Sequence, residues 1–201
     1  MRVVKNFIVF EGCDGSGTST AMTRLQTRLA AAGTPAVFTA EPSEAETGRL
    51  IRRSLAAAPA LSAQTLAYLF AADRAEHVYG AGGIVARAAD SLVFCDRYVL
   101  SSLVYQGISC GPDLPMRINA EFPAPEKLFY FDIDIETAQR RLSGRASLEI
   151  FEGAAFQRAV LDGYRAHLDF CRAQGTELVV IDAREPPECV EAAIARHLGI
   201  A

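Results

Sequence analysis

The chain has 201 residues, of which 50% are hydrophobic and 22% are charged, a composition that predicts a soluble protein with a substantial core in one domain. Its formal charge of −4 gives no general attraction to nucleic acid or to an anionic membrane, so we expect neither as a partner. Five scattered cysteines without a C-x-x-C pair favour a reducing cytoplasm over a disulfide framework or a zinc site, and no apolar run approaches the roughly 18 residues of a membrane span.

Short apolar runs alternate with longer segments rich in Ala, Leu and Arg, a pattern typical of βαβ units around a parallel sheet. The apolar character is nearly continuous along each run, which suits strands covered by helices on both faces. The predicted strands are 5–11, 36–40, 91–96, 128–134 and 178–182. The predicted helices are 18–32, 45–58, 62–88, 98–108, 135–144, 153–174 and 186–198, with a break expected near Gly80, Gly82 and Gly83. Ligands of such sheets bind beyond the carboxyl ends of the strands.

A glycine-rich turn, "GCDGSG", separates the first predicted strand from the first helix. The phosphate-loop pattern G-x-x-x-x-G-K-[ST] fits Gly12, Gly17 and Ser19, but Thr18 stands where the lysine belongs. Inward-turned backbone N–H groups and a helix N-terminus bind phosphate without lysine, and the Ser19 hydroxyl suits a Mg²⁺ ion on the phosphates. An ordinary turn is the alternative, but the position between strand and helix favours a phosphate site.

Two further pairs of residues have the chemistry of an acceptor site. Asp96 and Arg97 directly follow the buried run "LVFC", where a carboxylate can hold a magnesium-bound water and an arginine can bind an acceptor phosphate. The alternative is a helix N-cap beside an exposed arginine. Phe70 and Arg74 lie four residues apart, on one helix face. Spacing alone leaves open a core phenylalanine and a surface arginine paired with Asp73 or Glu76.

The motifs "FEGCDGSGTST", "LFAADRAEHV" and "FCDRYVLSSLVYQG" occur in the order and spacing of thymidylate kinases, and the chain resembles that family along essentially its whole length. The resemblance implies a P-loop kinase fold, a three-layer α/β sandwich over residues 1–201, with a five-stranded parallel sheet and a lid at about 140–152. It also implies an enzyme that transfers the γ-phosphate of ATP to dTMP, with Mg²⁺, and gives dTDP for dTTP synthesis. Family members are usually homodimers, so we expect a homodimer.

The resemblance also implies roles for individual residues. Phe70 would stack on thymine and Arg74 would bind a thymine carbonyl, while Asp14, which is otherwise a turn-stabilising residue, would approach the sugar 3'-hydroxyl during catalysis. Arg97 would act on the acceptor phosphate. The residues implied to bind ATP are Gly12, Cys13, Asp14, Gly15, Ser16, Gly17, Thr18, Ser19, Thr20 and Arg141, with Ser19 and Asp96 on the metal.

The remaining acceptor residues come from two segments. Ser102, Tyr105 and Gln106 resemble the segment that closes over the sugar and base, where packing against the sugar would exclude a 2'-hydroxyl. Glu41 and the following proline match the acidic-Pro pair after the second strand of the family. The neighbouring positions depart from the family's Arg-Glu-Pro-Gly-Gly, which leaves phosphate contacts from this loop open.

The missing lysine must be replaced by another cation. The chain has only two lysines, Lys5 and Lys127, and both are predicted at the starts of strands, at the edge of the sheet away from the phosphates. The lid offers Arg140, Arg141 and Arg145, although Ile150 stands where the family usually has arginine. We therefore expect Arg145 to be the catalytic arginine, with Arg141 as the next candidate.

Two other functions fit the sequence. One is a kinase for another deoxynucleotide or a deoxynucleoside. The other is a nucleotide-binding pseudokinase with little turnover, which the losses at Thr18 and Ile150 would favour.

Overall fold

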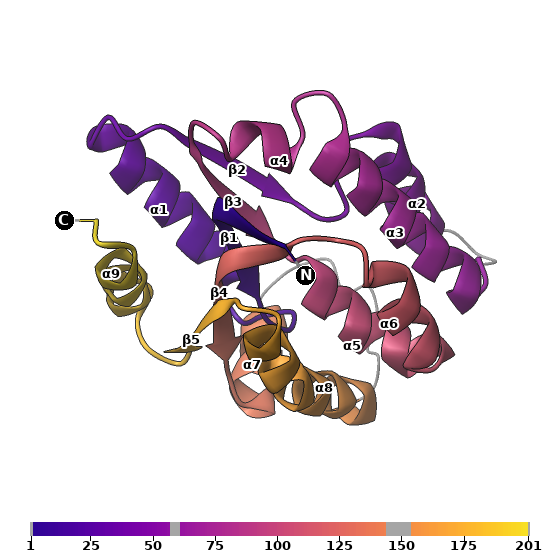
Figure 1. Ribbon diagram of the computed structural model, residues 1–201. Helices are drawn as coiled ribbons and strands as arrows, with labels where there is room; N and C mark the ends of the chain where they lie inside the picture. Colours follow the sequence, from indigo (N-terminus) through magenta and orange to yellow (C-terminus); the bar gives the residue numbers. More distant parts are fainter. Residues whose placement is uncertain (1, 57–60, 144–153, 201) are drawn as a thin grey trace.

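The computed structural model describes residues 2–56, 61–143 and 154–200. Its centre is a sheet of parallel strands in the order β2-β3-β1-β4-β5 (Figure 1). The strands are β1 (Val3–Glu11), β2 (Ala36–Ala40), β3 (Leu92–Asp96), β4 (Ala124–Asp132) and β5 (Glu177–Asp182). The predicted five-stranded parallel sheet is therefore confirmed.

Helices cover both faces of this sheet and make the three-layer α/β sandwich (Figure 1). The helices are α1 (Thr18–Ala31), α2 (Glu46–Ala56), α3 (Ala63–Tyr79), α4 (Ile84–Arg87), α5 (Val99–Cys110), α6 (Asp113–Asn119), α7 (Ile135–Ser143), α8 (Ala154–Ala173) and α9 (Pro187–Leu198). In the figure α1 and α9 lie together on one side of the sheet, and α3, α5 and α8 lie on the other. None of the helices in the described ranges is long and apolar enough to cross a membrane.

The core lies where the central strands meet both helical layers. Phe7 and Phe10 of β1 are fully buried, and Phe10 packs against Phe94 of β3 and Phe129 of β4. Because β1 is the middle strand, both of its faces are covered, which explains its nearly continuous apolar sequence.

Two strands begin at least two residues earlier than predicted. β1 starts at Val3 rather than at residue 5, and β4 covers 124–132 rather than 128–134. The charged Glu126 and Lys127 hid the start of β4, and the strand ends before Asp134 because the Asp134 side chain accepts a hydrogen bond from the backbone N–H of Thr137 and so caps α7.

The predicted helix over 62–88 breaks at its glycines, as expected. α3 ends at Tyr79, where the N–H of Gly80 donates to the carbonyl of Glu76, and Gly82 adopts a φ of +70° before α4 begins. Helix α6 was not predicted, because Pro115 interrupts a segment too short to show helical periodicity.

Neither lysine lies at the very start of its strand, since Lys5 is the third residue of β1 and Lys127 the fourth of β4. Both are committed to other contacts. Lys5 pairs with Glu126 at 2.8 Å, and Lys127 pairs with Glu177 at 3.0 Å and donates to the carbonyl of His197. The expectation that they lie away from the phosphate loop holds.

Candidate active site

The loop between β1 and α1 has the conformation of a phosphate cradle. Gly15 and Gly17 have φ values of +83° and +97°, in the left-handed region that glycine adopts without strain. The N–H of Ser16 donates to the carbonyl of Cys13, which closes the turn, and α1 begins at Thr18. The backbone donors at this helix N-terminus therefore remain available to an anion.

A cleft of about 570 Å³ opens above this loop. Its walls come from the loop, from the ends of β3 and β4, from α7 and from the segment after β5. The lining residues are Cys13, Asp14, Gly15, Ser16, Gly17, Thr18, Ser19, Thr20, Ala21, Asp96, Arg97, Phe131, Arg141, Leu142, Ala183, Glu185, Pro187 and Val190. All of the predicted loop residues except the buried Gly12 thus face one cavity, and burial raises the pKa of the Cys13 thiol in it to about 11.

Arg141 of α7 lies over the phosphate loop. Its Nη1 atom is 3.4 Å from the carbonyl oxygen of Gly15 and 3.3 Å from that of Ser16, and its Nη2 atom donates to the carbonyl of Ala183 at 2.9 Å. A Cβ atom added to Gly17 would lie 3.6 Å from Nη1. One guanidinium therefore joins the loop after β1 to the loop after β5 and places a positive charge beside the loop that lacks the lysine.

Ser19 and Asp96 meet at the edge of the sheet. The Ser19 hydroxyl donates to Oδ2 of Asp96 at 3.1 Å, and the other carboxylate oxygen, Oδ1, is buried without a hydrogen-bond partner. Oxygen ligands of this kind suit Mg²⁺, which keeps several waters and few protein ligands. The pair that the sequence predicted for a metal is thus brought together, with one acceptor unused.

Arg97 and Asp14 form an ion pair between the two predicted halves of the site. Nη2 of Arg97 is 2.6 Å from Oδ1 of Asp14, and the guanidinium lies over the ring of Tyr105, 5.2 Å from its centroid. Arg97 has a φ of +70°, an uncommon value for a residue with a side chain. Burial raises the pKa of the Tyr105 hydroxyl to about 12, so the ring faces the cation as a neutral phenol.

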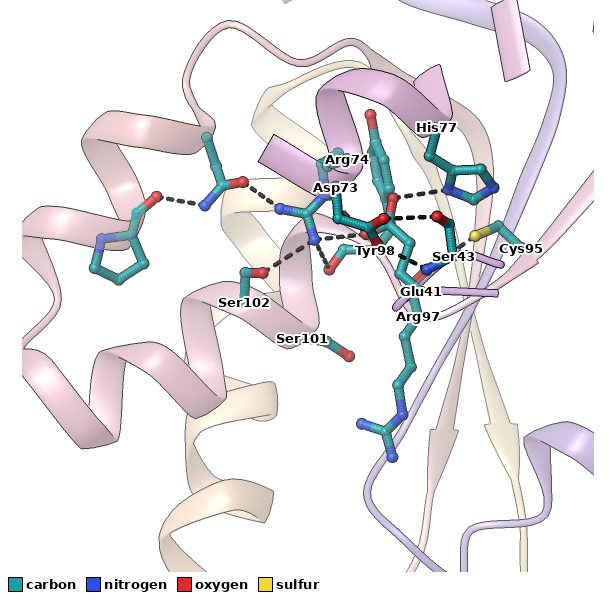
Figure 2. Close-up of polar contacts among 12 residues, drawn as sticks. Glu41, Ser43, Asp73, Arg74, His77, Cys95, Arg97, Tyr98, Ser101 and Ser102 are labelled. Atoms are coloured by element: carbon teal, nitrogen blue, oxygen red, sulfur yellow. Dashed lines mark hydrogen bonds and ion pairs between the residues drawn. The ribbon is translucent and has the colours of Figure 1, made fainter. Parts of the chain in front are cut away.

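Arg74 is buried in a polar cluster that includes Glu41 and Ser102 (Figure 2). Its Nη2 atom lies 2.6 Å from Oε2 of Glu41, 3.0 Å from the hydroxyl of Ser102 and 3.1 Å from the carbonyl of Tyr98. Its Nη1 atom donates to the side-chain oxygen of Asn119. The alternative of a surface arginine paired with Asp73 or Glu76 is therefore wrong.

The loop after β2 is tied to the same cluster. The other oxygen of Glu41 lies 3.1 Å from Nδ1 of His77, and Asp73 accepts from both the N–H and the hydroxyl of Ser43, at 2.7 and 2.6 Å (Figure 2). The Ser43 hydroxyl is thus occupied by Asp73. Glu41 instead neutralises and orients Arg74.

The structure also places Phe70 and Gln106, two of the predicted acceptor residues. Phe70 is only partly buried and lies outside the buried core cluster, which contradicts the alternative of a core phenylalanine. Oε1 of Gln106 is buried and accepts no hydrogen bond. Gln106 lies one helical turn after Ser102 on α5, which packs against α3, so both residues belong to the layer that holds Arg74.

Sequence reasoning missed two residues that build this site. Asn119 ends the unpredicted α6 and contacts Arg74. Glu11 is completely buried at the end of β1 and accepts hydrogen bonds from the start of α5. A carboxylate closing an apolar strand directly before a glycine loop was the available signal for Glu11.

The predicted lid at about 140–152 is described only as far as residue 143. Arg145, expected to be catalytic, and Ile150 lie outside the described residues. Of the three lid arginines, Arg140 and Arg141 lie in the described part of α7, and Arg141 is the one that lines the cleft.

Several named proteins are similar to this chain over most of its length. The sequence profile of the family described as Thymidylate kinase matches residues 10–194. A protein of Treponema pallidum that carries the name thymidylate kinase is 44% identical over 202 residues, which cover 98% of this chain and 97% of the relative. A relative of the same name in Aeropyrum pernix is 37% identical, over 90% of this chain and 86% of the relative. Another in Methanocaldococcus jannaschii is 38% identical, over 79% of each chain.

Proposed function

Because this chain belongs to the thymidylate kinase family, we propose that it transfers the γ-phosphate of ATP to dTMP and releases dTDP and ADP. The observation that carries the proposal is the ion pair between Asp14 of the phosphate loop and Arg97 at the end of β3, which brings a donor loop and an acceptor arginine within 2.6 Å of each other. Transfer between two nucleotides needs such a meeting of the two sites, since catalysis is mostly positioning and charge neutralisation.

On the donor side, the N–H groups of the phosphate loop would bind the β- and γ-phosphates. Arg141 would supply positive charge beside them, because its guanidinium already lies over Gly15 and Ser16. Arg145 remains our proposed catalytic arginine. With no lysine at position 18, these arginines and the loop would carry the neutralisation that a lysine usually shares.

Ser19 and Asp96 would hold Mg²⁺. The orphaned Oδ1 of Asp96 and the Ser19 hydroxyl supply the hard oxygen atoms that this ion prefers. When bound, the ion would neutralise charge on the transferring phosphoryl group.

On the acceptor side, Arg74 and Gln106 suit the two edges of a thymine ring. Four protein atoms around Arg74 fix the direction of its guanidinium, so that its remaining N–H capacity can serve a base carbonyl. The buried Oε1 of Gln106 lacks a donor, and the thymine ring N–H is one. Phe70 would stack on the base and Tyr105 would pack against the deoxyribose.

When dTMP binds, the ion pair between Asp14 and Arg97 would open and each side chain would contact the substrate. Arg97 would bind the acceptor phosphate, and Asp14 would approach the 3'-hydroxyl of the sugar. Their ion pair keeps both side chains at the cleft and limits their conformations, so less ordering is needed on binding.

We also propose that the protein is a cytoplasmic homodimer. Leu50 and Leu55 on α2 and Tyr68 on α3 are exposed on two helices that pack together, and a second copy would cover them. Light scattering would show a mass near twice that of the chain, and Leu55→Glu would reduce it towards the monomer. A wild-type monomer at micromolar concentration would contradict this assembly.

The direct test is to incubate the protein with ATP, Mg²⁺ and dTMP and to measure dTDP by chromatography and ADP by a coupled assay. Arg97→Met should abolish dTDP formation, whereas Arg172→Met, at an exposed pair with Asp169, should leave it unchanged. A panel of other deoxynucleotides and deoxynucleosides tests the acceptor. If dTMP raises the melting temperature but no dTDP forms over hours, the protein binds the nucleotide without acting as a kinase.

A further inference from the structure

Glu11 is a buried carboxylate that none of the steps above uses. It is 0% exposed, and both of its carboxylate oxygens accept hydrogen bonds from protein groups, so we place it outside the substrate contacts. It ends the strand that leads to the phosphate loop and contacts the helix that carries the acceptor residues. We infer that Glu11 is a positioning residue, which fixes the start of α5 relative to the phosphate loop. This inference rests on the phosphoryl transfer proposed above.

The carboxylate of Glu11 caps α5 from a distant strand. Oε1 accepts from the backbone N–H of Tyr98 at 2.8 Å and from that of Ser101 at 3.2 Å. These are the N-cap and N3 positions, whose N–H groups a capping box satisfies with two local side chains, and Tyr98 itself provides no side-chain cap. One residue of β1 therefore makes both hydrogen bonds.

Because of the chain connections, this cap also fixes the position of α5 relative to the phosphate loop. Gly12 directly follows Glu11 and opens the phosphate loop, and the carbonyl of Phe10 accepts from the N–H of Arg97 at 2.9 Å. Consecutive residues of one central strand thus anchor the donor loop, the acceptor arginine and the start of α5. A shift of the Glu11 carboxylate would move Ser102 and Tyr105 with their helix.

The second carboxylate oxygen of Glu11 is connected to Arg97 through two hydroxyl groups. Oε2 accepts from the Ser101 hydroxyl at 2.6 Å, and that hydroxyl lies 2.8 Å from the hydroxyl of Tyr164. The Tyr164 hydroxyl in turn lies 3.5 Å from Nη1 of Arg97. The contacts run from Glu11 to the acceptor arginine without passing through solvent.

The role requires a hydrogen-bond acceptor rather than a charge. Burial raises the pKa of Glu11, and the Ser101 hydroxyl and the charge of Arg97 oppose this shift. A carbonyl-type oxygen at Oε1 accepts both N–H groups whether or not the carboxyl is protonated. Glutamine should therefore replace Glu11, because its NH2 group can donate to the Ser101 hydroxyl, which can in turn donate to Tyr164. Leucine of similar size should not replace it.

The test compares Glu11→Gln, Glu11→Leu and Glu11→Asp in the full-length protein with ATP and dTMP. Leucine removes the acceptor, and aspartate shortens the reach by one methylene group. Both should lower kcat by about tenfold or more, because misplacement by about 1 Å costs up to about a hundredfold, while Gln stays within about threefold of wild type. ATP affinity should stay within about twofold in all three, because the phosphate loop itself is intact.

A matched control lies at the other end of the sheet. Glu126 also accepts a backbone N–H from a neighbouring strand, that of Asn6 at 2.7 Å, but it is remote from the cleft. Glu126→Leu should lower stability and leave kcat unchanged. A purely structural Glu11 would behave in the same way.

Three results would overturn the inference: wild-type kcat in the aspartate variant or in a folded leucine variant, a glutamine variant as slow as leucine, or ATP affinity that falls in parallel with kcat. If leucine prevents folding, the aspartate variant decides. Amide hydrogen exchange at Tyr98 and Ser101 tests the cap without turnover, and should accelerate about tenfold or more with leucine or aspartate but not with glutamine. A wild-type protein that makes no dTDP would refute the proposed function, and the exchange result would still decide the cap.

Discussion

Breaking the buried pair between Arg74 and Glu41 should destabilise the protein far more than breaking a surface pair. The Arg74 and Glu41 side chains are 1% and 3% exposed, and Arg74→Met would leave Glu41 with His77 as its remaining partner. Removing one member of a buried pair costs about 3–5 kcal/mol, because an uncompensated charge stays in the interior. For a chain of this length that lowers Tm by about 6–20 °C.

The assay is urea and thermal unfolding without nucleotide, followed by circular dichroism. The exposed pair of Arg172 and Asp169 gives the control, since Arg172→Met should cost less than about 1 kcal/mol. Adding Glu41→Gln to Arg74→Met removes the stranded charge and should recover about 1–3 kcal/mol. A single variant within about 1 kcal/mol of wild type, or a double variant no more stable than the single, would refute the reasoning.

Three further outcomes are expected. Phe70→Ala should weaken dTMP binding by about 1–3 kcal/mol in titration calorimetry. ATP binding and Tm should stay unchanged, because the partly buried ring lies outside the core, and a lower Tm would show that the ring stabilises the fold instead. The pKa of Glu11 is raised by burial, so its contribution to stability is complete below its unfolded pKa of about 4.3 and is lost as pH rises through the folded value. The unfolding free energy of Glu11→Gln relative to wild type should therefore increase as pH rises, and a difference independent of pH would contradict the raised pKa of Glu11. Arg145→Ala should lower turnover by about a hundred- to a thousandfold without changing dTMP affinity, and Thr18→Lys should restore part of it; wild-type turnover would shift the role to Arg141.

Much of the sheet and of the phosphate loop could be predicted from the sequence, because their signals are local. Gly15 and Gly17 adopt the left-handed turns that their lack of a side chain permits, and Ser19 meets Asp96 because adjacent parallel strands end at the same edge. The interruption of the long helix followed equally from three nearby glycines.

The environment of Arg74 could not be predicted, because its partners come from distant segments. Asn119 lies 45 positions away on α6, a helix whose proline and short length hid it, and Glu41 lies 33 positions away. The positive φ of Arg97 had no sequence signal either, since such backbone values are typical of glycine and asparagine. Burial and long-range pairing, rather than periodicity, determine these features.

The strand order β2-β3-β1-β4-β5 places β1 between two halves of the sheet, with β2 and β3 on one side and β4 and β5 on the other. Glu41 and Arg97 follow β2 and β3 on one side of β1, and Arg141 and Ala183 follow β4 and β5 on the other. The two halves still meet at the site, because Arg97 lies 3.5 Å from the Tyr164 hydroxyl of α8 and 2.6 Å from Asp14 of the phosphate loop. A substitution at the carboxyl end of β1 would therefore affect both halves at once, since Glu11 is hydrogen-bonded to the start of α5 and Gly12 opens the phosphate loop.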